Sequence, residues 1–272
     1  MTQDKPSSRT SDFSGIAHRY DETRSIPPHC LQKAFDRLIA HGLFPERGVI
    51  VDIGCGTGQI SLPLAERGYQ IRGFDISGEM IEYARSKAAP QWGTSFAVAD
   101  ACRLPTTDGC ADGVVVSKLL QHIEDWQQAC REMIRVVRPG ASIVHINERA
   151  AFGDAVRRHV RHLASELGFV RRYIGLDPHS RSELDAFMRA HSCEPIDIDT
   201  RDIQWATEIG YGEALERIRD GLFAEFWYLP ADIHDRIVAD TAAWVAAQPD
   251  GAATVDRLSP HLSVQVFRTP GG

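Results

Sequence analysis

The stretch that decides the fold is VDIGCGTG, residues 51–58, in which an apolar run and an acid lead into three glycines spaced G-x-G-x-G. The longer run GVIVDIG (48–54) is typical of a strand covered on both faces of a parallel sheet. The segment after it, QISLPLAERG (59–68), has the pattern of a helix that ends at Gly68. Glycines between a strand and a helix let backbone N–H groups approach a ligand, so the stretch predicts a nucleotide-like ligand. A tight turn without a ligand is the alternative.

Strand and helix patterns alternate from this stretch to residue 147, which predicts βαβ units and a parallel sheet. Further strands are expected at 69–75, 94–100, within 111–120 and at 141–147. Helices are expected at 29–42, at 77–88 with Ser77 as its cap, and from Asp125 to the stop at Arg138-Pro139-Gly140.

The pattern changes after residue 150. Helices are expected at 152–169, 180–192, 211–227 and 231–247, and strands at 194–206 and 261–269. We predict a disordered tail at 1–12, a ligand-binding core at 13–149, a helical lid insertion at 150–193, and C-terminal strands at 194–272 that complete the sheet around a helical insertion at 207–250.

Composition limits the class of protein. Hydrophobic residues make up 43% of the 272 residues and the formal net charge is -7, which is ordinary for a soluble globular protein and argues against a nucleic-acid partner. The N-terminus shows no signal-peptide pattern and no apolar run approaches membrane-spanning length, so a cytoplasmic protein without a membrane partner is expected. Six scattered cysteines without a C-x-x-C pair predict free, mostly buried thiols and no metal site.

The first candidate for the ligand is a dinucleotide. Its fingerprint, G-x-G-x-x-G, requires a third glycine at position 59, where this chain has Gln59. The third glycine comes one residue earlier, at Gly58. The spacing therefore disfavours an NAD-dependent dehydrogenase.

Four motifs occur in order: VDIGCGTG, GFDIS (73–77), AVADACRLP (97–105) and RVVRPGASIV (135–144). In order and spacing they resemble the motifs of class I S-adenosylmethionine-dependent methyltransferases, over residues 13–147. The C-terminal part loosely resembles the small-molecule branch of that family. The resemblance implies an α/β, Rossmann-like, seven-stranded and mostly parallel sheet flanked by helices, with an antiparallel last strand. The helical lid insertions lie in the C-terminal half.

The resemblance also implies residue roles for S-adenosylmethionine and its product S-adenosylhomocysteine. Asp52 faces the ammonium group, Asp75 accepts from the ribose hydroxyls, and Asp100 accepts from the adenine amino group. The full set of predicted cofactor-binding residues is Tyr20, Arg24, Asp52, Gly54, Cys55, Gly56, Gly58, Asp75, Ile76, Met80, Asp100, Ala101, Ser117 and His122. Simple structural roles remain the alternatives for Asp52 and Asp100, as a loop acid and a helix cap.

The segment AHRYDETR (17–24) resembles the family's N-terminal segment, in which a tyrosine and an arginine close over the cofactor. Arg24 is the candidate partner of the methionine carboxylate by charge-assisted pairing. Tyr20 is a candidate cover for the methyl-transfer site. Solvation of Arg24 at the surface and core packing of Tyr20 are the competing interpretations.

A base is needed only if the acceptor must lose a proton early. His122 lies just past the predicted fourth strand, at the switch-point edge of such a sheet, and titrates near neutrality. It is the catalytic candidate together with Tyr20, and the alternative is that His122 only shapes the pocket. Glu148 and His145 are second candidates.

The chain does not name the acceptor. Two sets of residues are compatible with an acceptor, an anionic one for five arginines (Arg157, Arg158, Arg161, Arg171 and Arg172) and a planar one for five aromatic residues (Trp205, Phe223, Phe226, Trp227 and Tyr228). For the arginines on the predicted helix, a solvated basic face is the preferred interpretation. For the aromatic residues ordinary core packing is the stronger interpretation. His159 and His162 share a helical face, but the arginines beside them disfavour a metal ion.

The resulting hypothesis is methyl transfer from S-adenosylmethionine to an oxygen or nitrogen of a small molecule, with catalysis mainly by positioning. The alternatives are a non-methylating enzyme that uses the same cofactor on the same fold, and a cofactor-binding protein without activity. The sequence leaves the oligomeric state open.

Overall fold

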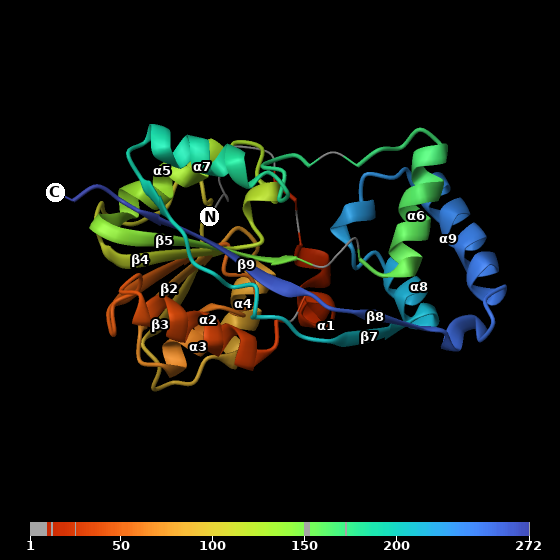
Figure 1. Cartoon of the computed structure of the whole chain (residues 1–272), viewed down its shortest axis with the longest axis horizontal. Helices are drawn as coiled ribbons and strands as arrows, with labels where there is room; N and C mark the ends of the chain where they lie inside the picture. The colour runs from red at the N-terminus through yellow and green to blue at the C-terminus, as the bar shows by residue number, and fades with distance from the viewer. Residues whose placement is uncertain (1–9, 12, 25, 150–152, 172, 272) are drawn as a thin grey trace. The chain divides into compact units, whose positions relative to one another are not determined.

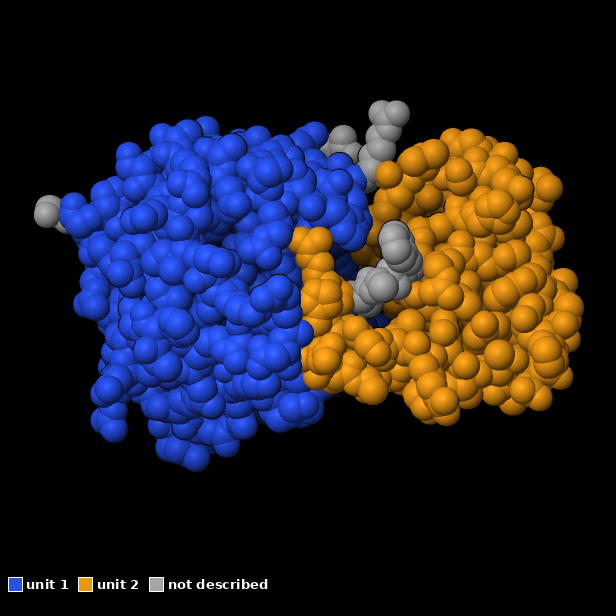
Figure 2. Space-filling model, viewed as in Figure 1, with its two compact units in different colours: residues 1–148, 173–203, 262–272 blue, residues 149–172, 204–261 orange. Residues whose placement is uncertain are grey.

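The computed structural model describes residues 10–11, 13–24, 26–149, 153–171 and 173–271 of the chain. It divides into two compact units (Figures 1 and 2). Unit 1 comprises residues 1–148, 173–203 and 262–272, and unit 2 comprises residues 149–172 and 204–261. Residues 173–203, placed partly in the predicted lid, therefore belong to unit 1. The function of unit 2 as a lid stays a prediction.

Unit 1 is built on a seven-stranded sheet in the order β3-β2-β1-β4-β5-β9-β6. The strands are β1 (Val49–Ile53), β2 (Gln70–Asp75), β3 (Thr94–Val98), β4 (Ala111–Ser117), β5 (Val137–Arg149), β6 (Glu194–Ile196) and β9 (His261–Arg268). β1, β2, β3, β4 and β5 pair in parallel, and β6 pairs antiparallel with β9. The predicted seven-stranded, mostly parallel fold is confirmed.

Helices cover both faces of this sheet. Those of unit 1 are α1 (Tyr20–Arg24), α2 (Pro28–Ala40), α3 (Ser61–Glu66), α4 (Gly78–Lys87), α5 (Trp126–Val136) and α7 (Arg181–Ala190), with short 3-10 turns η1 (Ser14–Arg19) and η2 (Leu120–His122). Figure 1 shows α5 and α7 on one face and α2, α3 and α4 on the other. Asp125 caps α5 by accepting from the Gln128 N–H at 3.0 Å, as its position predicts.

The structure corrects two predicted boundaries in unit 1. α5 ends at Val136, and Arg138-Pro139-Gly140 lie inside β5 rather than at a helix stop. The ring of Pro139 disfavours a helical backbone at the preceding residue, Arg138, so the chain is already extended at Arg138. The strand expected at 194–206 ends at Ile196, because the Asp199 carboxylate accepts from the Arg201 N–H and forms a turn.

Unit 2 is mainly helical. It contains α6 (Ala155–Glu166), α8 (Tyr211–Arg219), the 3-10 turn η3 (Ala224–Phe226), α9 (Ala231–Ala246), the turn η4 (Gly251–Ala253) and a two-stranded antiparallel ribbon, β7 (Thr207–Gly210) with β8 (Val255–Leu258). The expected helix over 211–227 is wrong beyond Arg219, because Gly221 adopts a φ of 69° and terminates it. The two four-residue ribbon strands lie outside every predicted strand.

Gly73 in β2 lies where side chains from β3 and from the glycine loop pack closely against the strand. A Cβ at this position would lie 2.5 Å from Phe96 and 3.0 Å from the Cys55 sulfur. We expect Gly73→Ala to destabilise the fold by about 1–3 kcal/mol through overpacking. Urea unfolding measures the effect. Gly78→Ala is the control, because a Cβ there meets nothing within 4 Å; equal stability of the two variants would contradict this packing argument.

Candidate active site

The glycine loop follows β1, and three of its residues have positive φ values that residues with side chains rarely adopt. Gly54, Gly56 and Gly58 have φ values of 69°, 52° and 85°. A Cβ at Gly54 would collide with the Leu119 side chain at 2.6 Å, whereas a Cβ at Gly56 would meet nothing within 4 Å. Gly54 therefore permits close packing, and Gly56 presents bare backbone to an open space.

Asp75, at the end of β2, fixes this loop. Its Oδ2 accepts from the Gly56 N–H at 2.9 Å and its Oδ1 accepts from the Ser77 N–H at 3.0 Å. Burial raises the pKa of Asp75, and the hydrogen bonds from backbone N–H groups oppose that shift. Each carboxylate oxygen can accept a further hydrogen bond, so Asp75 can also bind a pair of hydroxyls.

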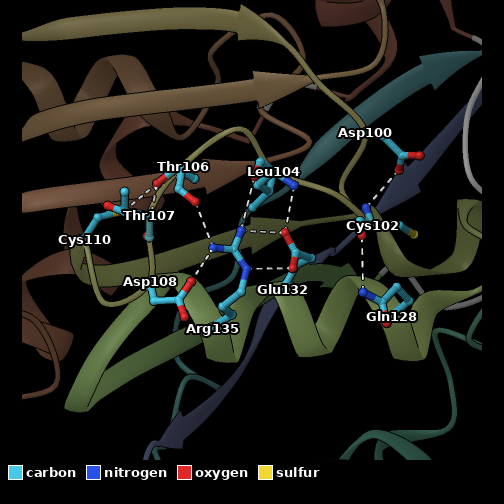
Figure 3. Close-up of polar contacts among 10 residues, drawn as sticks. All are labelled: Asp100, Cys102, Leu104, Thr106, Thr107, Asp108, Cys110, Gln128, Glu132 and Arg135. Carbon is cyan, nitrogen blue, oxygen red and sulfur yellow. Dashed lines mark hydrogen bonds and ion pairs between the residues drawn. The ribbon is translucent and has the colours of Figure 1, made fainter. Parts of the chain in front are cut away.

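The loop after β3 carries Asp100 and is fastened to α5 (Figure 3). Glu132 accepts from the Leu104 N–H at 2.7 Å, and Arg135 donates to the Leu104 and Thr106 carbonyls and to Asp108. Arg135 also pairs with Glu132 through two hydrogen bonds of 2.7 and 2.8 Å. Although burial of Glu132 opposes ionisation, the Arg135 hydrogen bonds hold the pKa of this carboxyl below its usual value.

An open cavity lies at the carboxyl ends of β1, β2 and β4. Ten of the predicted residues line it: Tyr20, Gly54, Gly56, Asp75, Ile76, Met80, Asp100, Ala101, Ser117 and His122. Their roles stay predictions, but the fold brings them together.

Four predicted residues do not line the cavity. Asp52 is buried and accepts from the Ser61 hydroxyl at 2.6 Å, and its other oxygen has no partner among the described residues. Cys55 is buried, and burial raises the pKa of its thiol. A Cβ on Gly58 would contact Leu62. Arg24 lies over the Tyr20 ring, 5.4 Å from its centroid.

The N-terminal segment of the described chain is attached to the glycine loop. The Thr57 hydroxyl donates to Asp21 at 2.5 Å, and the Gln59 amide donates to the Arg24 carbonyl at 2.9 Å. Thr10 pairs with Ile123, and the Ser11 N–H donates to the His122 carbonyl. Residues 1–9 and 12 lie outside the described residues, so the predicted tail stays a prediction there.

Lys118 is a cavity residue that sequence reasoning missed. It follows β4 with a φ of 52°, rare for a residue other than glycine, and lines the cavity. Its Nζ donates to the Arg24 carbonyl at 2.7 Å and to the Gln59 side chain at 3.2 Å. Burial lowers the pKa of Lys118 to about 8, against the attraction of Glu148. No sequence pattern marks a lysine as buried, because lysine is normally exposed.

Seven other lining residues were not assigned to the site: Thr10, Ser11, Phe13, Ser77, Ala99, Leu119 and Ile123. Ser77 was predicted only as a helix cap, and it does cap α4, accepting from the Met80 N–H at 3.2 Å. Most of the others come from the N-terminal segment and from the two residues that flank the η2 turn, where no periodic pattern exists to indicate which side chains face inward.

His122 and Tyr20 face the cavity from different elements. The His122 Nδ1 lies 3.2 Å from the Ser11 hydroxyl, and its ring packs edge-on against Phe13 with centroids 4.9 Å apart. Burial raises the pKa of Tyr20, so its hydroxyl stays protonated near neutrality. The Ser117 hydroxyl is buried, lines the cavity and has no hydrogen-bond partner among the described residues.

The secondary candidates do not line the cavity. His145 is buried, with Nε2 3.1 Å from the Asn147 amide. Glu148 is near enough to affect the pKa of Lys118 and of Tyr20. In unit 2, His159 stacks on Trp244 at 4.3 Å and His162 pairs with Glu166. Among the described residues no cluster of histidine, cysteine or acidic side chains is placed to hold a metal ion.

Four of the five aromatic candidates in unit 2 fall into two groups, and the fifth, Trp205, is half-buried. Phe223 and Phe226 are in the buried core of the unit, as the core-packing interpretation predicts, whereas Trp227 and Tyr228 are exposed.

All six cysteines are free, and five are buried. In the part of the chain that the structure describes, no helix has the length and apolarity needed to cross a membrane.

The glycine loop, the acid at the end of β2 and the cavity at the carboxyl edge define a Rossmann-like nucleotide-binding protein. The family model of the methyltransferase domain matches residues 51–145. The demethylmenaquinone methyltransferase of Deinococcus radiodurans is 30% identical over 178 residues, covering 61% of this chain and 72% of the relative. The chain belongs to the class I S-adenosylmethionine-dependent methyltransferase family.

A second relative is similar in sequence, and a solved structure is similar in fold alone. The demethylmenaquinone methyltransferase of Desulfitobacterium hafniense is 34% identical over 153 residues, 53% of this chain and 60% of that protein. The crystal structure of the YcgJ protein from Bacillus subtilis superposes with a TM-score of 0.58 at 23% identity, covering 90% of this chain and 99% of YcgJ. The chain spans about half to three-fifths of the length of several curated relatives that it matches.

Asp52 gives a stability prediction. Burial raises its pKa to about 7, against the hydrogen bond from Ser61. Between about pH 4 and about pH 7, Asp52 holds a proton in the folded chain that it has lost in the unfolded chain. The contribution of Asp52 to the free energy of unfolding therefore falls as pH rises through this window. We expect Asp52→Asn to gain stability relative to the wild type by about 2–4 kcal/mol across that window. Urea unfolding at both ends measures it, and parallel pH profiles would contradict it.

Arg135 gives a binding prediction. Removing its guanidinium loosens the loop that carries Asp100, so we expect Arg135→Met to weaken S-adenosylhomocysteine binding by about fivefold, the equivalent of one hydrogen bond. Calorimetry measures the dissociation constant. Arg131→Met is the matched control, because Arg131 lies on the same helix and contacts Gln128 and the Phe187 ring. Equal weakening in both variants would show that the network around Arg135 does not position Asp100.

Proposed function

We propose that the chain transfers a methyl group from S-adenosylmethionine to an oxygen or nitrogen of a small molecule. The observation that carries this proposal is the geometry of Asp75, which holds the glycine loop at Gly56 and still faces the cavity. Family membership supports the same cofactor. When bound, S-adenosylmethionine supplies an electrophilic methyl group on a positively charged sulfur.

The cavity residues fit that cofactor. Asp75 offers acceptor positions for two ribose hydroxyls, and Ile76 and Met80 give an apolar surface beside it for the adenine. Asp100 accepts from the Cys102 N–H at 2.8 Å and keeps further acceptor capacity for the adenine amino group. The unpartnered Ser117 hydroxyl supplies an additional polar group, and Gly56 leaves room for a ligand to approach the backbone.

His122 is the proposed base. An acceptor hydroxyl or amine loses its proton as its oxygen or nitrogen is methylated, and a neutral imidazole can take up that proton. The Ser11 hydroxyl and the Phe13 ring orient the imidazole. Tyr20, which stays protonated, covers the cavity from α1 and helps to exclude water. Positioning of the two reactants supplies the larger part of the effect.

Calorimetric titration of the full chain tests the proposal. S-adenosylmethionine and S-adenosylhomocysteine should bind in the micromolar range, and NAD should not bind. Incubation with a panel of phenols, amines and hydroxy acids should then produce one product heavier by a single methylene group, together with S-adenosylhomocysteine. Binding without any turnover would favour a non-catalytic protein, and a product without the added mass would favour a non-methylating enzyme.

Asp75 gives the residue-level prediction. Asp75→Asn removes the charged acceptor, and hydrogen bonds to charged groups are worth about 1.5–3 kcal/mol, so we expect binding of S-adenosylhomocysteine to weaken by about tenfold or more. Asp36→Asn is the control, because Asp36 is exposed and pairs with Arg67. If calorimetry shows unchanged affinity in Asp75→Asn, this carboxylate does not bind the ribose.

A further inference from the structure

Three groups from different parts of unit 1 meet at the end of α1. The Lys118 ammonium donates to the Arg24 carbonyl at 2.7 Å and to the Gln59 side-chain oxygen at 3.2 Å. The Gln59 side-chain N–H donates to the same Arg24 carbonyl at 2.9 Å. Each of the three groups therefore contacts the other two. Gln59, Lys118 and the Arg24 carbonyl are together named the clasp.

The donors and acceptors of the clasp fit in one arrangement. A lysine ammonium only donates hydrogen bonds, and a backbone carbonyl only accepts them. The Gln59 amide therefore has to turn its oxygen to Lys118 and its nitrogen to the Arg24 carbonyl, which is the orientation in the structure. A rotated amide would place donor against donor and acceptor against acceptor. A glycine at position 59, as the dinucleotide fingerprint requires, would have no side chain for either contact.

The backbone of Lys118 is held in an unusual conformation. Its φ of 52° lies in the left-handed region that favours glycine. Its N–H donates to the Ile146 carbonyl of β5 at 3.2 Å, and its carbonyl accepts from the Gln121 side chain at 2.9 Å. These contacts anchor Lys118 to the sheet and to the η2 turn. Strained residues that are fixed by their surroundings in this way cluster at functional sites.

The clasp holds the helix that brings Tyr20 to the cavity. Arg24 is the last residue of α1, and Tyr20 is the first. Tyr20 packs edge-on against Phe13 with ring centroids 5.8 Å apart, and the Arg24 guanidinium lies within 6 Å of both ring centroids. Phe13 also packs edge-on against the His122 ring. Fixing the backbone of Arg24 therefore helps to fix the aromatic part of the cavity wall, formed by Phe13 and Tyr20.

α1 has a second attachment near its beginning. The Thr57 hydroxyl and the Lys87 ammonium donate to the two carboxylate oxygens of Asp21, at 2.5 and 2.8 Å. The clasp holds the other end of this short helix. Because the Asp21 contacts would persist, we expect loss of the clasp to loosen the aromatic part of the wall without unfolding the chain.

We propose that Gln59 and Lys118 are positioning residues, which hold the aromatic part of the wall at the cavity and so slow the release of the cofactor and its product. With a pKa of about 8, Lys118 is mostly protonated near neutrality, so its hydrogen bond to the Arg24 carbonyl is charge-assisted. The inference goes beyond the proposed function, because neither residue takes part in methyl transfer. It rests on that function only in placing the cofactor in the cavity.

Surface plasmon resonance on the immobilised full chain measures the dissociation rate of S-adenosylhomocysteine. Lys118→Met removes both lysine contacts and keeps a side chain of similar length. We expect dissociation to become about tenfold faster, since a hydrogen bond from a charged group is lost. Lys33→Met is the matched control, because Lys33 is exposed and pairs with Asp202. Equal rates in the wild type and in Lys118→Met would overturn the proposal.

Hydrogen exchange of the ligand-free chain separates positioning from a general loss of stability. In Lys118→Met, the amides of residues 13–24 should exchange about tenfold faster than in the wild type, while those of β1 and β4 stay unchanged. A purely structural role would instead speed exchange throughout unit 1 and lower the melting temperature, and that outcome would contradict the proposal.

A double-substitution cycle tests whether the clasp acts as one unit. Gln59→Met should speed dissociation by about fivefold, and Gln32→Met on the exposed face of α2 is its control. The effect of the double variant, Gln59→Met with Lys118→Met, should be smaller than the product of the single effects, because both single variants lose the contact between the two residues. Multiplicative effects would indicate independent contacts and refute the clasp.

The outcomes for the proposed function and for the clasp are distinguishable. Absent binding of S-adenosylhomocysteine to the unmodified chain would refute the proposed function and the effect on release, while exchange of residues 13–24 would still test the hold on the wall. Intact binding with unchanged dissociation and exchange in Lys118→Met would refute only the clasp.

Discussion

The carboxylate of Asp75 is the contact on which the site depends. β1 and β2 are parallel neighbours with Ile53 opposite Phe74, so the loop after β1 and the end of β2 meet at one edge of the sheet. Asp75 joins them by accepting from Gly56 N–H and Ser77 N–H. Without this contact, a loop rich in glycine would be free to sample many conformations. One acidic side chain therefore orders the backbone and presents its remaining acceptor positions to the cavity.

The position of the N-terminal segment depends in turn on the ordered glycine loop. Thr57 and Gln59, on either side of Gly58, hold the α1 segment through Asp21 and the Arg24 carbonyl. Lys118 adds a buried cation that donates to the same carbonyl. Burial lowers the pKa of this lysine, and the charges of Glu148 and Asp21 offset part of that shift, whereas Arg24 adds to it. The glycine loop thus lines the cavity and also anchors the N-terminal part of the cavity wall.

Most of unit 1 could be predicted because its signals are local. Strand–glycine–helix spacing located Gly54, Gly56 and Asp75, and parallel topology alone brings such positions to one edge of a sheet. Lys118 and Phe13 were not found, because their position depends on tertiary contacts and no periodicity marks them. Asp52 was expected to face the ligand, yet strand alternation turns its side chain toward Ser61 in the interior. The short ribbon strands β7 and β8 were missed because four residues carry little pattern.

The two units show why the cofactor could be inferred more readily than the acceptor. The nucleotide part of a site is recognised largely by backbone geometry, and glycine spacing records that geometry in the sequence. The arginines of unit 2 were visible as a basic run, but a basic run on a helix is usually a solvated face. Only the fold brings Arg171 and Glu225, distant in sequence from α6, to Arg157 and Arg161. The ion pairs of a mostly buried Glu225 with three guanidinium groups are thus a product of tertiary structure, and no pattern within α6 alone indicates them.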